Sequence, residues 1–376
     1  MHHQIRSFDD LLCCFQPGKS PLQCIDHRLT TLAEKKTIKE LLHDLETLIA
    51  KNPLLEEHCH PIVHAIGRRA AKLAPTIAEA FHDCDHQCQS GCYHGVIERI
   101  FTGEEQLQEE NTHLTLEEMS PKIPTICSNL GTIDHRGEFY IQCTHGLGHA
   151  ILFSIDYKLT DALHGCDLLP DTIGRGSCYL GVFMENVVAG DQSKRDLRED
   201  DPLYPCTAVA GRYRLECWKQ QTKVMIHMEK SPSEIVALCA KAGKYQDVCI
   251  EGLGRDTSAG ARGPDVEKTV KICEDHAGPF LDSCIGGAVR ALVDFTWDPH
   301  YAYRYCEELS APAARAACYR ITQDHLRRYY EQDQKAIEDG CQTFAGNGSA
   351  LCIVQSRLAD APITTSWSEW LLSLFR

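Results

Sequence analysis

Two pairs of residues that can bind metal ions are spaced so that each pair shares one face of a helix. His94 precedes Glu98 by four residues, and His145 precedes His149 by four. Side chains four apart on a helix point toward the same neighbour. Imidazole nitrogens and a carboxylate are common ligands of zinc and iron. The sequence therefore predicts a transition-metal site, for Zn or Fe, at these four residues.

A third pair with the same spacing, His60 and His64, lies upstream. Counted against the nearest cysteines, this pair is out of register with the other two by at least one residue. We expect it either to complete a second metal site or to be unrelated to the first. The dipeptide Glu185-Asn186, farther along the chain, is a candidate extension of the same polar patch.

Two other interpretations of the histidine pairs compete with metal binding. The chain contains 19 histidines, so a single pair at helical spacing is often only a polar packing patch. A His/Glu pair could also act in catalysis without a metal. Two pairs at the same position of neighbouring repeats favour the metal site. The pattern identifies no catalytic residue and leaves open whether the protein is an enzyme.

The spacing of the cysteines indicates which elements must position these pairs. The chain of 376 residues has 21 cysteines, and the last twelve fall into consecutive pairs separated by 10 to 12 residues. The second cysteines recur at intervals of 32 to 39 residues, which is typical of a two-helix repeat. Glycine or proline, such as Gly243 and Pro312, lies between the paired cysteines and indicates a turn. The six pairs are Cys166 and Cys178, Cys206 and Cys217, Cys239 and Cys249, Cys273 and Cys284, Cys306 and Cys318, and Cys341 and Cys352.

Each cysteine pair therefore brackets the turn of a helical hairpin. Antiparallel helices bring such cysteines to a Cα separation of about 4.4 to 6.8 Å, which suits a disulfide. Zinc ligands are the alternative, but zinc sites usually use cysteines only two to four residues apart. With Cys127 and Cys143 as a further pair and Cys92 opening another unit, the predicted fold is all-α. It is an α-solenoid of about eight helical hairpins, each stapled by an intra-repeat disulfide.

The cysteines near the N-terminus do not follow this pattern. Because the total is odd, at least one thiol lies outside any intramolecular disulfide. The spacing leaves the pairing of these residues open: Cys13, Cys14, Cys24, Cys59, Cys84, Cys88 and Cys92.

Four segments follow from these patterns. Residues 1–52 are expected to form an N-terminal helical cap, and 53–190 form His/Cys-rich repeats that contain the candidate metal site. Residues 191–360 form the regular disulfide-stapled repeats, and 361–376 form a C-terminal capping tail.

Glycine recurs at the third residue after the second cysteine in five of eight units. A glycine within a helix costs about 1 kcal/mol relative to alanine, so its recurrence predicts close contact between neighbouring helices. The five residues are Gly95, Gly146, Gly181, Gly252 and Gly287.

One disulfide in each helical hairpin is an architecture that resembles the secreted Sel1-like cysteine-rich proteins. The resemblance rests on the repeat length and the cysteine pairing, and it covers most of the chain. It implies a helical-repeat fold and assigns no functional residue.

Charge and hydropathy limit the partners that we expect. A net charge of −15 and a sequence pI near 5.7 oppose binding to nucleic acid or to anionic membrane surfaces. No stretch reaches the roughly 20 apolar residues that span a bilayer. The disulfide pattern predicts an extracytoplasmic location, periplasmic or secreted, although Met1 to Arg6 lack the apolar core of a secretory signal. The expected partner is a metal ion, and the alternative is a metal-free scaffold that binds a protein or peptide.

Overall fold

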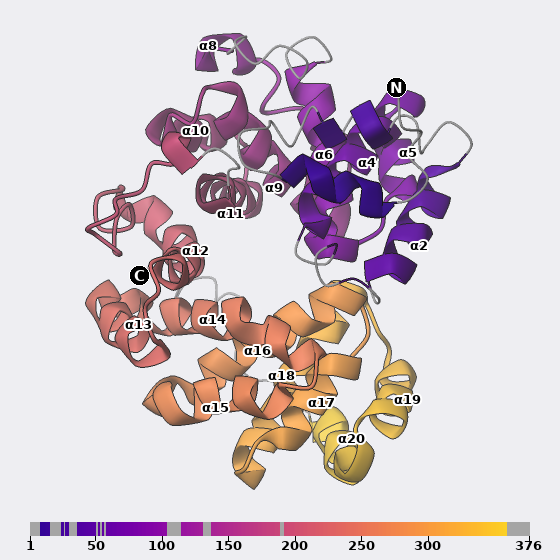
Figure 1. Cartoon of the computed structure of the whole chain (residues 1–376), viewed down its shortest axis with the longest axis vertical. Helices are drawn as coiled ribbons and strands as arrows, with labels where there is room; N and C mark the ends of the chain where they lie inside the picture. The colour runs from indigo at the N-terminus through magenta and orange to yellow at the C-terminus, as the bar shows by residue number, and fades with distance from the viewer. Residues whose placement is uncertain are drawn as a thin grey trace. The chain divides into compact units, whose positions relative to one another are not determined.

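The computed structural model describes residues 8–15, 24–25, 27–29, 36–49, 52, 55, 58–103, 114–130, 137–188 and 192–358. Every regular element in these ranges is a helix (Figure 1), which confirms the all-α prediction. The chain divides into two compact units, Met1–Met228 and Glu229–Arg376. Among the helices in the described ranges, none is both long enough and apolar enough to cross a membrane.

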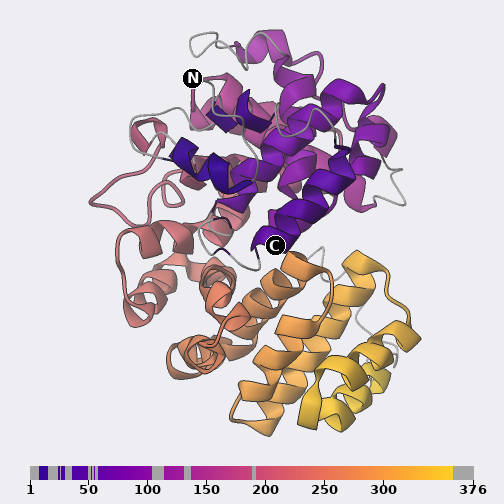
Figure 2. The ribbon, with the colours of Figure 1, turned by 45° about the vertical axis from the view of Figure 1, so that its right-hand side comes forward.

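The first unit is built around a row of helices in which each member packs on the next. Helix α4 contacts α6, α6 contacts α9, α9 contacts α11, and α11 contacts α12. Figure 2 shows the helices of the first unit in indigo through magenta. The helices of this unit are α2 (Ile38–Ile49), α4 (Cys59–Leu73), α5 (Ile77–Asp83), α6 (Gln87–Thr102), α8 (Leu116–Met119), α9 (Glu138–Ser154), α10 (Leu159–Asp167), α11 (Thr172–Val188) and α12 (Arg214–His227), with 3-10 segments η1 (Phe8–Phe15), η3 (Ser128–Leu130), η4 (Gln192–Lys194) and η5 (Gly211–Tyr213).

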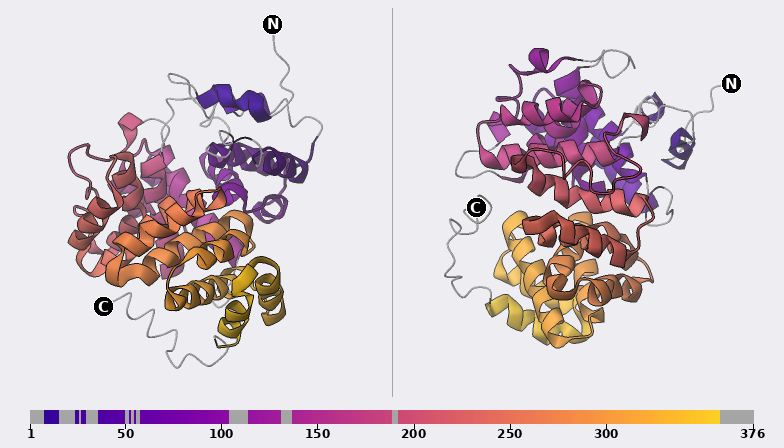
Figure 3. Two further views of the ribbon diagram at one scale, coloured as in Figure 1. Left: turned by 60° about the horizontal axis from the view of Figure 1, so that its bottom comes forward. Right: turned by 90° about the vertical axis from the view of Figure 1, so that its left-hand side faces the viewer.

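The second unit consists of four hairpins in two rows. Helices α14, α16, α18 and α20 form one row and α13, α15, α17 and α19 form the other, while each odd-numbered helix also contacts the even-numbered helix that follows it. Figure 3 shows these hairpins in orange to yellow. Their bounds are α13 (Pro232–Cys239), α14 (Gln246–Thr257), α15 (Val266–His276), α16 (Leu281–Thr296), α17 (His300–Glu308), α18 (Pro312–Tyr330), α19 (Gln334–Phe344) and α20 (Ser349–Leu358), with η6 (Ala240–Tyr245), η7 (Ser258–Arg262), η8 (Gly278–Phe280) and η9 (Gly346–Gly348) between helices.

Local signals in the sequence begin several of these helices. At α13, the Ser231 side chain accepts a hydrogen bond from the backbone N–H of Glu234, and the Glu234 side chain accepts one from the backbone N–H of Ser231. Such a capping box satisfies two backbone donors that have no partner within the helix. Pro232, in the first turn, already has the φ angle of a helix. Asp333 caps α19 in a similar way by accepting a hydrogen bond from the backbone N–H of Ala336.

The six predicted C-terminal cysteine pairs all form disulfides, with Cα–Cα distances of 5.4 to 5.6 Å. Cys127 and Cys143 are also bonded. These seven bonds each connect a helix or turn to the helix that follows. The prediction that cysteine spacing marks the turn of each hairpin is therefore confirmed for the described residues.

Three more disulfides resolve the N-terminal cysteines that spacing left open. They are Cys14–Cys24, Cys59–Cys88 and Cys84–Cys92. Cys13 is the one cysteine outside the ten bonds, in agreement with the odd total. The bond between Cys59 and Cys88 joins the starts of α4 and α6, so it ties the two helices that carry the first histidines.

Glycines bring the backbones of neighbouring helices into direct contact. A Cβ atom on Gly287 in α16 would lie 1.9 Å from the carbonyl oxygen of Glu251, and one on Gly254 in α14 would lie 1.9 Å from that of Cys284. The two contacts are reciprocal, because each helix presents its glycine to the backbone of the other.

The same reciprocal contact joins α4 to α6 and α9 to α11. These contacts confirm the predicted close approach of neighbouring helices at Gly95, Gly181 and Gly287. The contact at Gly146 is less close, because a Cβ there would lie 3.0 Å from the nearest atom. The partner glycines on the other helix of each contact, Gly67, Gly148 and Gly254, were not identified from the sequence.

We predict that Gly287→Ala destabilises the protein, although alanine normally favours a helix. The new methyl group has no room against the Glu251 carbonyl, and overpacking of this kind costs about 1 to 3 kcal/mol. Gly286→Ala is the matched control, because its Cβ would first meet the flexible end of Arg290 at 3.4 Å. Urea unfolding of both variants measures the difference. Equal stability of the two variants would contradict the backbone contact.

His86, which precedes α6, makes a second prediction that concerns pH. Burial lowers the pKa of His86 to about 2, whereas in the unfolded chain it is about 6.5. Below pH 6.5 the unfolded chain gains a proton that the folded protein does not accept. Stability is therefore lost as the pH falls from about 6.5 toward 2, by about 1.4 kcal/mol per pH unit for this residue. The free energy of unfolding of His86→Gln, measured in urea, should fall less steeply with pH than that of the wild type, and parallel slopes would refute the assignment.

Candidate metal centre

Three adjacent helices of the first unit carry all six predicted metal ligands. Helix α4 holds His60 and His64, α6 holds His94 and Glu98, and α9 holds His145 and His149. Glycines that follow two of these histidines set the spacing of the helices. A Cβ on Gly95 would lie 1.9 Å from the carbonyl oxygen of His64, and one on Gly146 would lie 3.0 Å from the Cα of His94.

The glycine contacts between helices give the register of the first histidine pair. Gly67 packs on the neighbouring helix as Gly148 does, and each follows a histidine, His64 or His145, by three residues. His64 is therefore equivalent to His145, and Ile62 occupies the place of the second cysteine in α4. His60 then lies one turn before the position equivalent to His145, so the pair His60 and His64 is shifted by four residues from the other two pairs.

The histidines form two groups that share one member. The ligand atoms of His60, His64 and His94 all lie within 4.8 Å of one another, and so do those of His94, His145 and His149. The ring centroids of His60 and His64 are 4.5 Å apart, and those of His94 and His149 are 5.0 Å apart. The first unit thus brings five imidazoles into one cluster.

The first group has two nitrogen lone pairs directed at each other. The Nδ1 of His60 donates to the carbonyl oxygen of Cys88 at 2.6 Å, and the Nδ1 of His64 donates to Glu98 at 2.6 Å. In neutral rings, protons on Nδ1 leave lone pairs on both Nε2 atoms, which are only 3.0 Å apart. Lone pairs at this distance repel unless a cation lies between them. Bonds of about 2.0 to 2.1 Å to a tetrahedral zinc ion would place two such nitrogens about 3.3 Å apart.

A left-handed turn provides the carbonyl group that orients His60. Cys88, Gln89 and Ser90 have φ angles of 54°, 59° and 61°, in a region that costs a residue with a side chain about 1 to 2 kcal/mol. The turn is held between two disulfides, Cys59–Cys88 and Cys84–Cys92. Strained backbone that is maintained by its surroundings is common at functional sites.

Two further buried nitrogens lie in the cluster without a hydrogen-bond partner among the described residues. They are the Nδ1 of His94 and the Nε2 of His149. The other nitrogen of each ring does have a partner: the Nε2 of His94 lies 3.3 Å from the Oε1 of Gln142, and the Nδ1 of His149 lies 2.8 Å from Glu185. A buried polar atom that makes no hydrogen bond costs about 1 to 3 kcal/mol. A bound cation would remove this cost.

The carboxylates lie behind the histidines. Glu98 accepts a hydrogen bond from His64 on one oxygen and from Arg68 on the other, at 2.7 Å. Glu185 similarly accepts from His149 and, at 2.7 Å, from the hydroxyl of Tyr157. The two close groups therefore contain only histidines, and Glu98 occupies a different place from the direct ligand that the sequence predicted. Carboxylates in this position orient a metal-binding histidine and increase its basicity.

Burial keeps three histidines of the cluster in the neutral state that a metal ion requires. It lowers the pKa of His60, His94 and His145 well below the usual range, and neighbouring histidines lower it further. Burial alone would raise the pKa of Glu98, but His64 and Arg68 outweigh it and hold that pKa well below its usual range. Neutral imidazoles and ionised carboxylates are the forms that bind metal ions.

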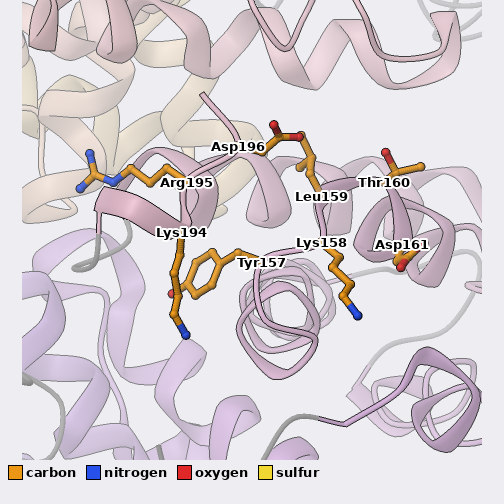
Figure 4. Close-up of a pocket in the computed structure, with 8 residues that line it drawn as sticks. All are labelled: Tyr157, Lys158, Leu159, Thr160, Asp161, Lys194, Arg195 and Asp196. Carbon is orange, nitrogen blue, oxygen red and sulfur yellow. The ribbon is translucent and has the colours of Figure 1, made fainter. Parts of the chain in front are cut away.

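Other candidate sites in the described residues are weaker. Cys13, Cys14 and Cys24 also lie close together, but the last two form a disulfide and cannot act as thiolate ligands. A hollow of about 440 Å³ lies beside Tyr157. The basic side chains that line it, Lys158, Lys194 and Arg195, point in different directions (Figure 4), so they do not converge on a ligand.

The second unit contains His325, a buried histidine that has a carboxylate partner but lies outside the histidine cluster. His325 lies 2.6 Å from Asp294, which also accepts a hydrogen bond from Tyr330 at 2.7 Å. This arrangement resembles that of His149, Glu185 and Tyr157. Because no other histidine, cysteine or carboxylate of the described residues completes a metal-binding group there, His325 is a suitable control for the cluster.

Comparison with known proteins finds no family model, no curated protein and no solved structure that matches the chain. The functional inference therefore rests on the geometry of the cluster.

We predict that Glu98→Gln destabilises the protein. The guanidinium group of Arg68 is only 3% exposed, and removal of one charge from a buried ion pair costs about 3 to 5 kcal/mol. Chemical denaturation should show this loss. Glu338→Gln provides the comparison, since it breaks the exposed pair with Arg357 and should change stability little. Similar effects of the two substitutions would argue against a buried ion pair at Glu98.

Proposed function

We propose that the protein binds a transition-metal ion in the histidine cluster of its first unit. The observation that carries this proposal is the pair of Nε2 atoms of His60 and His64, which lie 3.0 Å apart while both Nδ1 atoms donate elsewhere. A packing patch of neutral histidines would place a donor against an acceptor. Here two acceptors face each other, and a metal ion resolves the repulsion.

The type of ligand favours zinc. Three or more imidazoles without a direct carboxylate suit Zn²⁺, whereas Mg²⁺, Ca²⁺ and Mn²⁺ prefer oxygen ligands. Iron is the second candidate, but the common iron site uses two histidines and one carboxylate. In this cluster, Glu98 and Glu185 are occupied by hydrogen bonds to His64 and His149. We propose that both carboxylates orient ligands and do not bind the ion directly.

The architecture suggests how the site is maintained. We propose that the hairpins form an α-solenoid of about eight repeats, similar in plan to the Sel1-like proteins. The row of contacts α14, α16, α18 and α20, with a second row of α13, α15, α17 and α19, supports this proposal. The ten disulfides indicate an oxidising environment, and we propose a periplasmic or secreted location. In such a location thiolate sites are oxidised, whereas a histidine site remains able to bind metal.

We predict that protein purified without chelators contains zinc or takes it up on titration, as measured by elemental analysis and competition with a chromogenic chelator. His64→Ala removes a ligand and should weaken binding by at least about 10-fold, as the loss of an orienting partner alone does. At a free zinc concentration of about 100 Kd, binding should raise the free energy of unfolding by about 2.7 kcal/mol.

His325→Ala is the matched control, because it removes a buried histidine with a carboxylate partner outside the cluster. Its zinc affinity should equal that of the wild type. A wild-type protein that contains no transition metal and binds none on titration would contradict the proposal. The protein would then be better explained as a metal-free scaffold that binds a protein or peptide.

A further inference from the structure

We propose that the cluster holds two metal ions that share His94 as a bridging ligand. This inference rests on the proposed function, because it concerns the number of ions in the same cluster. The first ion lies at His60, His64 and His94, and the second lies at His94, His145 and His149. Each group consists of ligand atoms that are within 4.8 Å of one another, and His94 is their one common member.

The dimensions of the cluster are too large for one ion. When two imidazoles bind one tetrahedral zinc ion through bonds of about 2.0 to 2.1 Å, their nitrogens lie about 3.3 Å apart and their ring centroids about 5 Å apart. The ring centroids of His60 and His149 are 6.4 Å apart, and those of His64 and His149 are 5.8 Å apart. By contrast, the rings of His94, His145 and His149 lie 4.8 to 5.0 Å from one another. His145 and His149 are therefore arranged around their own centre.

Each group also has its own carboxylate. Glu98 orients His64 in the first group and is itself held by Arg68. Glu185 orients His149 in the second group and is held by Tyr157. A carboxylate that accepts the other ring N–H of a ligand histidine fixes its orientation. The duplication of this arrangement on α6 and α11 matches two ions, each with one histidine that is fixed by a carboxylate.

His94 has both nitrogens available for the bridge. Its Nδ1 is buried without a hydrogen-bond partner among the described residues. Its Nε2 makes only a long contact of 3.3 Å to Gln142. When the second ion binds, the remaining N–H bond of the ring breaks, a nitrogen–metal bond forms, and the proton passes to solvent. No electron is transferred, and the imidazole becomes an imidazolate.

The charges favour an anion at the second ion. Two divalent ions bring four positive charges, while Glu185 and the imidazolate offset two, since Glu98 is already balanced by Arg68. His60 in the first group and His145 in the second are half-buried, whereas His64, His94 and His149 are almost fully buried. Each site thus has one histidine that solvent can reach, and an anionic ligand would complete the coordination of the second ion, whose group includes the uncharged His145.

Copper titration of the intact protein, followed by electron paramagnetic resonance, tests the shared ligand. We expect two equivalents of Cu²⁺ to bind. The first should produce the signal of an isolated ion, and the second should reduce that signal because the two spins couple through the ring of His94. Calorimetry in two buffers of different ionisation enthalpy should show one additional proton released with the second ion.

Substitutions identify the two sites. His145→Ala should bind one equivalent with an uncoupled signal, and His325→Ala, outside the cluster, should retain two coupled ions. His94→Gln should weaken both sites, and circular dichroism shows whether this variant is folded. If this variant does not fold, the wild-type titration still tests whether two coupled ions bind.

Three results would overturn the two-ion centre: one equivalent bound by the wild type, two equivalents with independent signals, or an unchanged stoichiometry in His145→Ala. All three leave the proposed function intact, because metal still binds in each case. If no Cu²⁺ or Zn²⁺ binds, both the two-ion centre and the proposed function are wrong.

Discussion

Direct contact between helix backbones at glycine is the constraint on which the histidine cluster depends. Two histidines of the cluster are followed immediately by glycine, in His94-Gly95 and His145-Gly146. With no side chain at Gly95, α6 can approach so closely that its Cα lies against the carbonyl group of His64. Histidines at equivalent positions of α4, α6 and α9 are then close enough for their rings to meet. A larger residue at these glycines would separate the helices and disperse the ligands.

The disulfides and the cluster place different demands on the first unit. A disulfide stabilises a fold mainly by limiting the unfolded chain. The buried nitrogens of His94 and His149 that have no hydrogen-bond partner among the described residues destabilise it. The Cys59–Cys88 and Cys84–Cys92 bonds lie where this cost is concentrated, beside His60 and the left-handed turn at Cys88. Cross-links at this place allow the protein to keep an arrangement that hydrophobic packing alone would not favour. A bound ion would recover part of the cost.

Much of the fold could be predicted because it depends on short distances along the chain. Cysteines 10 to 12 residues apart can meet only if the chain turns between them, so their spacing predicted both the hairpins and six of the bonds. The N-terminal bonds could not be predicted in this way. Cys59 and Cys88 are 29 residues apart, and Cys59, Cys84 and Cys88 were all candidate partners for Cys92. Only the packing of α4 on α6 decides among them.

The sequence by itself determined which residue types face one another, because i and i+4 share a helix face whatever the surroundings. For that reason His60, His64, His94, His145 and His149 could be selected before the structure was considered. Only the tertiary structure decided their roles. It placed Glu98 behind His64 and against Arg68, and it brought Glu185 from α11 to His149. Helical periodicity specifies the direction of a side chain but not its distance from another helix, and that distance is decided by the glycine contacts between helices.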